Sequence, residues 1–596
     1  MVDASSKLQS GLLQGNVFHL GNYDECLDVE VNEQWGSFVG QYCLVASIFK
    51  NIPNVTHIFG IAPLFWSLCV PSTCTPQDLQ YVLSRINKNM IVNPLLCHTK
   101  NSSRPLETID WIAITVFLLL GILCVLSTTY DLVVTDKEKR NRVLLIFSWY
   151  SNGKALFNIR GGQNSLNAIH GIRFLSMCAI VLVHTEALSL AQPSINIIPF
   201  LAKVREWPHL YFGNLQFAVD IFFVLSGMLL CYVTMQILDS GRTFNVPIFY
   251  LHRFLRITPL WGAVVLVHVS FIDKLGGGPL WDFARIGVDK SVCTEYWWSA
   301  LLYIQNYVND SEMCVIPSWF LAVDMQMFWI SPIFLITLHK RPKIGVGLTI
   351  IASMLGIILS FVESYNHEDH PDFTRTLTTS KVNYTYFHTH TRCVPWFVGL
   401  LCGYLVYSTT DWRARVAAGI DSLPKITVTL AWLLAIVLLT GVYVSLHPFQ
   451  QLDYEYNVVE AALYHALTRP LWAIAITWVI FACVSGYGGL LNTILSWPVW
   501  RPLARLTFAI YLIHFDVVLG HIISARVPVY QSVLNKFREF FLNLIVTLIL
   551  AIVLTLAIES PCVQIEKILF SRGSRNTYRE VGNSSEHTTI ITMKNK

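Results

Sequence analysis

Long apolar runs separated by short polar segments dominate this chain. Runs long enough to cross a membrane lie at about 111–133, 174–192, 214–237, 248–271, 318–338, 344–363, 393–408, 426–446, 463–484, 503–524 and 540–559. About 20 apolar residues in a helix span the hydrocarbon core while pairing all backbone polar groups internally. The pattern predicts an all-α polytopic membrane protein with about 11 transmembrane helices, of which 393–408 is the least secure.

Composition agrees with this prediction. The chain is 54% hydrophobic and 13% charged, with a mean hydropathy of +0.50, whereas soluble domains are about 25% charged. We therefore exclude a soluble globular protein, expect the lipid bilayer as a partner, and expect no nucleic-acid partner.

The basic residues predict an orientation. Alternate segments at 134–173, 238–256, 339–343, 409–425, 485–505 and 560–596 hold 24 lysines and arginines, about twice the number in the opposite loops between spans. By the positive-inside rule the basic set is cytosolic. We expect a cytosolic C-terminus and an external or lumenal N-terminus, in the endoplasmic reticulum or the plasma membrane.

These signals divide the chain into five parts. We expect an external Cys-rich domain at 1–108, a first transmembrane helix at 109–133 and a basic cytosolic linker at 134–171. A ten-helix membrane domain at 172–560 and a cytosolic tail at 561–596 complete the prediction. Within the external domain, Thr75 followed by Pro76 and Asp78 is typical of a helix start.

Cysteines and glycosylation sequons fit the predicted external side. Five cysteines (Cys26, Cys43, Cys69, Cys74 and Cys97) crowd the first domain, and Cys293 and Cys314 flank an external loop. We expect Cys293 and Cys314 to be joined, and we expect the odd N-terminal cluster to leave one free thiol or to form an artefactual dimer. That odd number, with no export signal before the domain, suggests that the sequence begins inside the domain. Sequons at Asn54, Asn101, Asn309 and Asn383 fall outside, and Asn583 lies on the tail.

A charged pair inside one apolar run is the strongest candidate for chemistry. Arg173 and His184 are eleven residues apart, which places them on nearly the same helical face and about 16 Å apart in depth. Ionisable groups at membrane depth are costly, and histidine exchanges protons near neutral pH. The alternative is a structural histidine that hydrogen-bonds a neighbouring helix.

Two further polar groups lie in the following runs. Asp220 and Gly227 share a helical face, with Ser226 beside a glycine that permits close backbone approach. Arg253 and Arg256 stand three apart at a predicted cytosolic boundary. They either anchor the helix or, beside Arg173, form a clamp for phosphates.

The later runs also carry polar residues. Asp324 and Gln326 are predicted just inside a span from the outside, where Asp324 either forms an ion pair or orients a histidine. Thr507, Tyr511 and His514 form a polar stripe on one helical face that must avoid lipid. Arg392 and Arg469 add cations at the outer ends of spans.

Together these motifs resemble the acyltransferase-3 family of membrane O-acyltransferases over about 165–560. The pieces are Arg173 with His184, VDIFFVLSG, RFLRITP, SWFLAVDMQ and LTFAIYLIH, in that order. With the upstream ECL, YC and CVPSTC segments, the chain is similar to the animal branch named nose resistant to fluoxetine. Asp324 stands where many bacterial relatives carry glutamate, which is a departure from their pattern.

The resemblance implies transfer of an acyl group from an acyl-CoA-type co-substrate to a hydroxyl acceptor, such as a lipid, sterol, glycan or drug-like molecule. It implies no bound cofactor and no metal. His184 would act as general base with Arg173 and Asp324, and Arg253 and Arg256 would bind the donor. Supporting positions would be Asp220, Ser226, Trp319, Gln326, Arg392, Tyr511 and His514.

Two other classes of function use the same features. A lipid or small-molecule transporter would employ His184 and the arginines for proton coupling and anion binding. A receptor-like protein would bind a ligand through its external domain. Dependence of thioester cleavage on His184 would distinguish the enzyme from the transporter.

Overall fold

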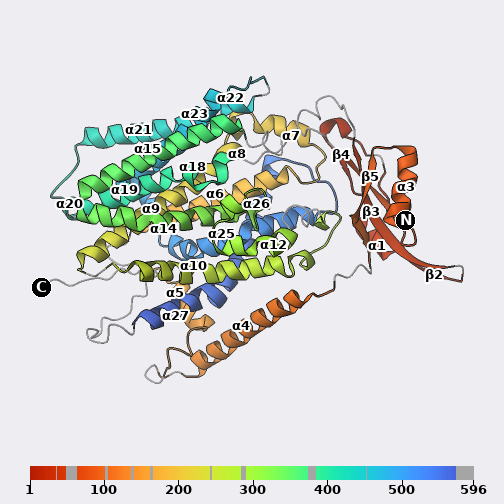
Figure 1. Ribbon diagram of the computed structural model, residues 1–596, viewed down its shortest axis with the longest axis horizontal. Helices are drawn as coiled ribbons and strands as arrows, with labels where there is room; N and C mark the ends of the chain where they lie inside the picture. Colours follow the sequence, from red (N-terminus) through yellow and green to blue (C-terminus); the bar gives the residue numbers. More distant parts are fainter. Residues whose placement is uncertain are drawn as a thin grey trace.

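The computed structural model describes the chain except residues 8, 35, 49–62, 101–104, 135, 137–139, 161–165, 242–243, 283–289, 373–383, 452 and 572–596. A small sheet domain lies at one end of a helical bundle (Figure 1). The predicted fold class is confirmed, although the strands of the first domain were not predicted.

The N-terminal domain is built around one long strand. Its elements are β1 (Phe18–His19), α1 (Tyr23–Asp28), β2 (Glu30–Glu33), β3 (Gly36–Ile48), β4 (Pro63–Pro71), α3 (Pro76–Ile86) and β5 (Met90–Thr99). Strand β3 pairs antiparallel with β4, with β2 and with β5, and β1 runs parallel to β4. Alternating residues of β3 therefore reach a small core that includes Tyr42 and Leu44.

Two disulfides hold this sheet together. Cys43 of β3 is bonded to Cys97 of β5, and Cys26 of α1 is bonded to Cys69 of β4. Cys74 is the leftover thiol and is exposed. The predicted start of α3 is confirmed, because Thr75 and Asp78 form a reciprocal capping box with Pro76 at the first turn.

Nine helices of the described chain are long and apolar enough to cross a membrane. They are α4 (Thr108–Val133), α6 (Asn167–Ser189), α9 (Ala218–Asp239), α14 (Trp319–Lys340), α15 (Pro342–His367), α21 (Lys425–Ser445), α23 (Val458–Val484), α25 (Trp500–Ile523) and α26 (Val533–Leu554). The other two predicted spans are also helices. Helix α10 (Val246–Val269) carries two arginines and two histidines, and α19 (Val394–Ser408) has only 15 residues. The chain is a multi-pass membrane protein.

Short elements lie before, between and after the spans. They are η1 (Leu12–Gln14), α5 (Trp149–Leu156), α7 (Ile197–Val204), η2 (Trp207–His209), α8 (Tyr211–Asn214), η3 (Leu215–Phe217), η4 (Ile272–Lys274), α12 (Lys290–Leu301), α13 (Gln305–Val308), η5 (Ile316–Ser318), α17 (Tyr384–Phe387), α18 (Thr389–Arg392), α20 (Thr410–Ala417), α22 (His447–Gln450), α24 (Gly489–Leu495), the π-helical turn η6 (Thr555–Glu559) and α27 (Ser560–Ser571).

Helices α9 and α19 pack closely because glycines line their contact. A Cβ atom on Gly227 of α9 would lie 2.2 Å from the Trp396 carbonyl oxygen. Cβ atoms on Gly399 and Gly403 of α19 would lie 2.2 and 2.3 Å from carbonyl oxygens of α9. The expected close approach at Gly227 is therefore confirmed, and it fixes the depth and rotation of the helix that carries Asp220 and Ser226.

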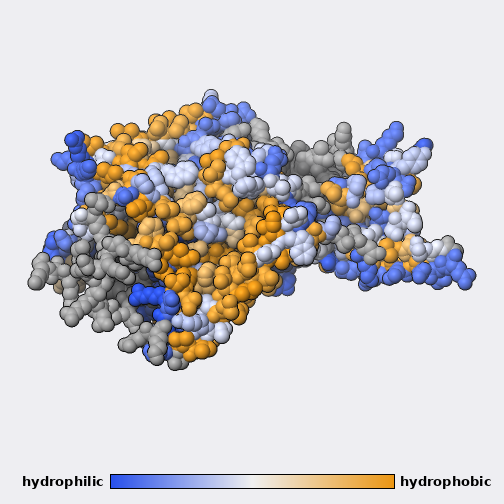
Figure 2. All heavy atoms as spheres, turned by 60° about the horizontal axis from the view of Figure 1, so that its bottom comes forward, coloured by the Kyte–Doolittle hydropathy of each residue, from blue (hydrophilic) through white to orange (hydrophobic). Residues whose placement is uncertain are grey.

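The sheet domain docks on loops at one end of the bundle. Leu20 packs with Leu280 and Ile523, His98 lies 2.7 Å from Asp282, and Arg526 contacts Asp24 at 3.1 Å. Figure 2 shows apolar side chains over the helical part and mostly hydrophilic ones on the sheet domain. This surface pattern is that of a membrane domain with a soluble domain at one end.

Helix α4 stands at the edge of the bundle (Figure 1). Only 17% of its apolar stretch is buried. Near its first turn Asp110 accepts a hydrogen bond from Lys274 at 2.5 Å. Near its last turn Asp131 accepts from Arg140 at 2.8 Å and from Ser148 at 2.6 Å. Both ends of α4 are therefore held by buried carboxylates.

Cys293 and Cys314 form the predicted disulfide, which joins α12 to the loop before η5. Asn309 lies inside this cross-linked loop and is only 6% exposed. Its side chain accepts a hydrogen bond from Ser299 at 2.8 Å and donates one to the Glu312 carbonyl at 2.6 Å. A glycan at Asn309 is therefore incompatible with this fold, which corrects one predicted site. Asn54, Asn101, Asn383 and Asn583 lie outside the described residues.

Candidate active site

The structure brings two histidines together in the middle of the bundle. His184 of α6 and His514 of α25 are stacked, with ring centroids 5.0 Å apart, and His184 Nδ1 lies 3.3 Å from His514 Nε2. His514 is fully buried, whereas His184 is partly exposed. Phe515 covers the His184 ring edge-on, with centroids 5.4 Å apart.

Hydrogen bonds define the proton positions in this pair. His514 Nδ1 lies 2.7 Å from the Tyr511 carbonyl oxygen and 3.2 Å from that of Ile510. Because carbonyls only accept, Nδ1 of a neutral His514 carries the proton and its Nε2 is an acceptor. His184 then donates from Nδ1, and its Nε2 keeps a free lone pair. This tautomer is the one that a general base at Nε2 requires.

A second polar group joins α9, α10 and α14. Asp324 accepts a hydrogen bond from Ser226 Oγ at 2.5 Å and another from Arg253, whose guanidinium also lies 4.5 Å from the centre of the Phe328 ring. The ion-pair interpretation of Asp324 is therefore the correct one, and its orientation of a histidine is not observed. Arg253 is turned to Asp324 within the bundle rather than left at a boundary.

Arg173 and Arg256 differ from Arg253. Within the described residues neither forms a hydrogen bond or an ion pair, and Arg256 is exposed while Arg173 is partly exposed. They lie within electrostatic range of each other, with Asp324 as the nearby carboxylate for Arg173 and Glu559 for Arg256. Two adjacent cations with unused donors are suited to an anionic group.

Other predicted residues lie toward the end of the bundle that carries the sheet domain. Asp220 and Arg392 form a buried pair at 3.5 Å, and the Arg392 guanidinium lies 4.8 Å from the centre of the Trp319 ring. Gln326 donates to the Tyr303 carbonyl at 2.7 Å, and the Tyr511 hydroxyl donates to the Pro317 carbonyl at 2.6 Å. Gln326 and Tyr511 therefore tie their helices to the backbone at Tyr303 and Pro317. Neither is hydrogen-bonded to His184.

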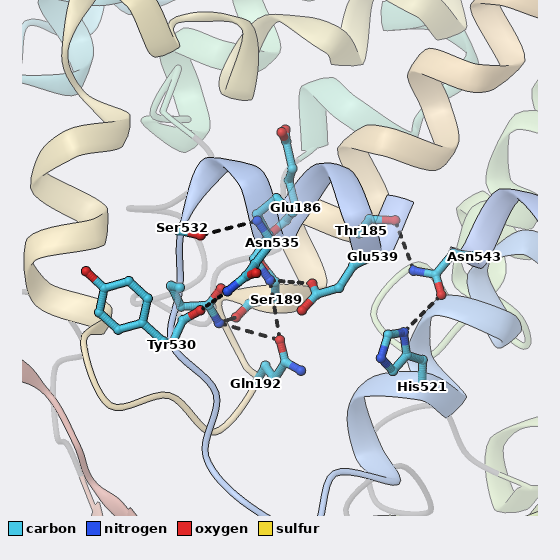
Figure 3. A network of polar contacts seen from close by, with 12 residues as sticks. Thr185, Glu186, Ser189, Gln192, His521, Tyr530, Ser532, Asn535, Glu539 and Asn543 are labelled. Atoms are coloured by element: carbon cyan, nitrogen blue, oxygen red, sulfur yellow. Dashed lines mark hydrogen bonds and ion pairs between the residues drawn. The ribbon is translucent and has the colours of Figure 1, made fainter. Parts of the chain in front are cut away.

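Sequence reasoning missed a polar network that includes Thr185, the residue after His184 in α6 (Figure 3). Thr185 accepts a hydrogen bond from Asn543 of α26 at 3.3 Å, and Lys536 donates to Glu539 at 2.6 Å and to Gln192 at 3.4 Å. Glu186 is 1% exposed and points away from this network, with no hydrogen bond to either oxygen. A carboxylate two residues after His184 in an apolar run was the signal that could have identified Glu186.

No group of three or more histidine, cysteine, aspartate or glutamate side chains in the described part of the chain is arranged to hold a metal ion. The paired histidines supply groups for proton transfer, and Arg173 lies eleven residues before His184 on the same helix.

A polytopic helical bundle with a pair of stacked histidines between two of its helices defines an integral membrane protein with a polar site inside the bundle. Comparison of the sequence with protein families identifies the class of protein more specifically. The family described as "Acyltransferase domain" matches residues 166–559. The chain belongs to this acyltransferase-3 family and is an acyltransferase. The model described as "Nose resistant-to-fluoxetine protein, N-terminal domain" matches residues 1–83.

Individual relatives agree with both matches. The chain is 27% identical to "Nose resistant to fluoxetine protein 6" of Caenorhabditis elegans, over 100% of this chain and 80% of that protein. It is 25% identical to "Regulator of hypoxia-inducible factor 1" of the same organism, over 67% of this chain and 80% of that protein. It is 24% identical to "Putative peptidoglycan O-acetyltransferase YrhL" of Bacillus subtilis, over 61% of this chain and 52% of that protein. No solved structure matches the chain.

Proposed function

We propose that this protein transfers an acyl group from an acyl-CoA-type donor to a hydroxyl group of the acceptor, with His184 as general base. The observation that carries the proposal is the hydrogen-bonded series from the Tyr511 carbonyl through His514 to His184. The names of the bacterial relatives as O-acetyltransferases support a hydroxyl acceptor.

The proposed step balances without a further reactant. His184 Nε2 takes the proton of the acceptor hydroxyl while the oxygen attacks the thioester carbonyl carbon. The carbon–sulfur bond breaks, and His184 gives the proton to the departing thiolate. The products are an ester and a free thiol. His514 positions the base by accepting a hydrogen bond from the Nδ1–H group of His184.

Arg173 and Arg256 are the proposed contacts for the donor phosphates. Their guanidiniums are unpaired among the described residues, and each planar fork matches phosphate oxygens. Arg173 lies eleven residues before His184 on α6, about 16 Å along the helix axis. The flexible arm of an acyl-CoA would extend across this separation. Arg253 contributes by fixing Asp324 and not as a free donor.

We also propose the orientation of the protein. The basic loops would face the cytosol, which places Arg173 and Arg256 toward the compartment that holds acyl-CoA and the sheet domain outside or in the lumen. The endoplasmic reticulum and the plasma membrane both fit this arrangement.

The test is acyl transfer by the purified full chain in detergent, with labelled acetyl-CoA and longer acyl-CoA donors. His184→Ala should lower the rate by about 10² to 10⁴ and leave the protein folded. His339→Ala, at the far end of α14 and partly exposed, is the matched control and should retain activity. Wild-type turnover in His184→Ala would overturn the proposal. Substrate flux that needs His184 without thioester cleavage would support the transporter instead.

Donor binding is tested separately through the arginines. Arg173→Gln and Arg256→Gln should raise the donor KM more than the acceptor KM, and lysine should rescue only part of the loss. Arg253→Gln should instead reduce the yield of folded protein because it leaves Asp324 without its cation. Unchanged donor KM in Arg173→Gln and Arg256→Gln would remove both from the donor site.

A further inference from the structure

Helix α27, the last helix of the described chain, packs against α10. The π-helical turn η6 joins it to α26, and α10 contacts both η6 and α27. His252 of α10 lies 2.6 Å from Glu566 of α27, and its ring lies 4.2 Å from the Phe570 ring, centre to centre. Glu566 and Phe570 are four residues apart and so share one helical face. These contacts fix which face of α27 is turned toward α10.

This docking brings a lysine of α27 close to Arg256. Lys567 directly follows Glu566 and lies within electrostatic range of Arg256, which lies in turn within range of Arg173. Lys567 and Arg256 are exposed, and Arg173 is partly exposed. Among the described residues, none of the three forms a hydrogen bond or an ion pair. Three cationic side chains from α6, α10 and α27 therefore lie in series with their N–H donors unused.

Three carboxylates near this series already bind other groups. Their partners are Thr555 for Glu559, His252 for Glu566, and Ser226 with Arg253 for Asp324. Each carboxylate acts on one of the three cations through space, but none accepts a hydrogen bond from them within the described part of the chain. The carboxylates reduce the local positive charge and leave the N–H donors open to an anion from solvent.

We propose that Lys567 is a third contact for the phosphates of the acyl donor, beside Arg173 and Arg256. This inference rests on the proposed function, in which the donor is a CoA thioester. CoA carries a diphosphate and a separate phosphate on its ribose, so it presents anionic groups at more than one place. A row of three cations can contact these groups separately, whereas a single guanidinium fork binds one phosphate at a time.

The chemistry of lysine suits an exposed position in this series. Its ammonium binds phosphate as a point charge and needs no fixed plane, whereas a guanidinium binds best when its fork is oriented. Lys567 would contact a phosphate and not the reacting thioester, so it is a donor-specificity residue and not a catalytic one. His252 would act through Lys567, because its contacts with Glu566 and Phe570 set the position of α27.

Equilibrium binding of labelled CoA to the purified full chain in a neutral detergent tests the proposal. Lys567→Gln should raise the Kd for CoA about three- to fivefold, the range expected for one exposed charge contact, and Lys567→Arg should restore most of the affinity. Pantetheine has the thiol arm of CoA without its phosphates, so its affinity, measured by displacement of CoA, should not change. An unchanged Kd for CoA in Lys567→Gln, or an equal loss of affinity for pantetheine, overturns the proposal.

Two further variants separate a local effect from a general one. Lys425→Gln is the matched control, because Lys425 is an exposed lysine at the start of α21, across the bundle from α27 (Figure 1). It should leave the Kd for CoA unchanged. His252→Ala should raise this Kd, and its combination with Lys567→Gln should add no further loss, because both changes remove the same contact. Fully additive losses would exclude His252 as the positioning residue.

Acyl transfer measured on the same samples distinguishes failure of this inference from failure of the proposed function. If Lys567→Gln weakens CoA binding but the unaltered protein transfers no acyl group, the phosphate contact stands and the proposed reaction is wrong. If the unaltered protein transfers acyl groups and its CoA affinity does not depend on Lys567, this inference alone is wrong. Absence of CoA binding by the unaltered protein overturns the inference together with the proposed donor.

Discussion

The close packing of α9 against α19 predicts that a larger residue in place of Gly399 destabilises the protein. In Gly399→Ala the new Cβ would lie 2.2 Å from the Val224 carbonyl oxygen, more than 1 Å short of ordinary contact. The obstacle is backbone, which cannot rotate away as a side chain can. Overpacking of this kind lowers the free energy of unfolding by about 1–3 kcal/mol. We expect a loss near the upper end of this range for Gly399→Ala. A shift of α9 by that distance would also break the 2.5 Å hydrogen bond from Ser226 to Asp324.

The matched control is Gly441→Ala in the lipid-facing helix α21, where a Cβ would meet nothing within 4 Å. Alanine is the better helix former there, so this variant should gain about 0.5–1 kcal/mol. Thermal unfolding in detergent, with acyl transfer measured on the same samples, compares the two. Equal midpoints for the two variants, or a stabilised Gly399→Ala, would refute the close approach of α9 and α19.

Three further outcomes follow from the contacts described above. His514→Phe should lower kcat about fivefold with an unchanged donor KM, because a hydrogen bond of about 1 kcal/mol that positions His184 is lost; an unchanged kcat would exclude a positioning role for His514. Peptide mapping without reduction should recover Cys293 linked to Cys314, and Cys314→Ser should cost on the order of 3 kcal/mol; two free thiols would contradict the fold. Asn309→Gln should leave any glycosidase-sensitive mass shift unchanged, since that side chain is buried, and a lost shift would place a glycan there.

Features that depend on local sequence were predictable. Apolar run length identified all eleven helices as elements, and the capping pattern at Thr75 placed the start of α3 within a residue. The Cys293–Cys314 bond followed from two cysteines flanking one loop. In each case neighbouring residues carry the information, through helix periodicity, capping or short loop closure.

Features that depend on packing between distant segments were not predictable. His184 and His514 are separated by 330 residues, so their contact requires knowledge of how α6 and α25 pack. For Asp324 the sequence allowed either an ion pair or the orientation of a histidine, and the packing of α10 against α14 selects the ion pair with Arg253. The sheet of the first domain was not predicted because its strands differ in length and show no regular alternation of apolar and polar residues. Two disulfides, rather than a large apolar core, help to hold these strands together.

The position of helix α4 at the edge of the bundle limits which of its residues can be substituted. Only 17% of its apolar stretch is buried in the protein, so substitution of one apolar residue by another at its exposed positions should be tolerated as long as the helix still spans the bilayer. Positions that should resist exchange are Asp110 and Asp131, whose carboxylates bind Lys274 at one end of the helix and Arg140 at the other. Ser127 and Thr128 should resist it as well, because Ser127 donates to the Leu144 carbonyl and Thr128 accepts from the Trp149 amide. A foreign apolar segment that keeps these four residues and replaces only exposed positions between them should therefore serve as well as the native one.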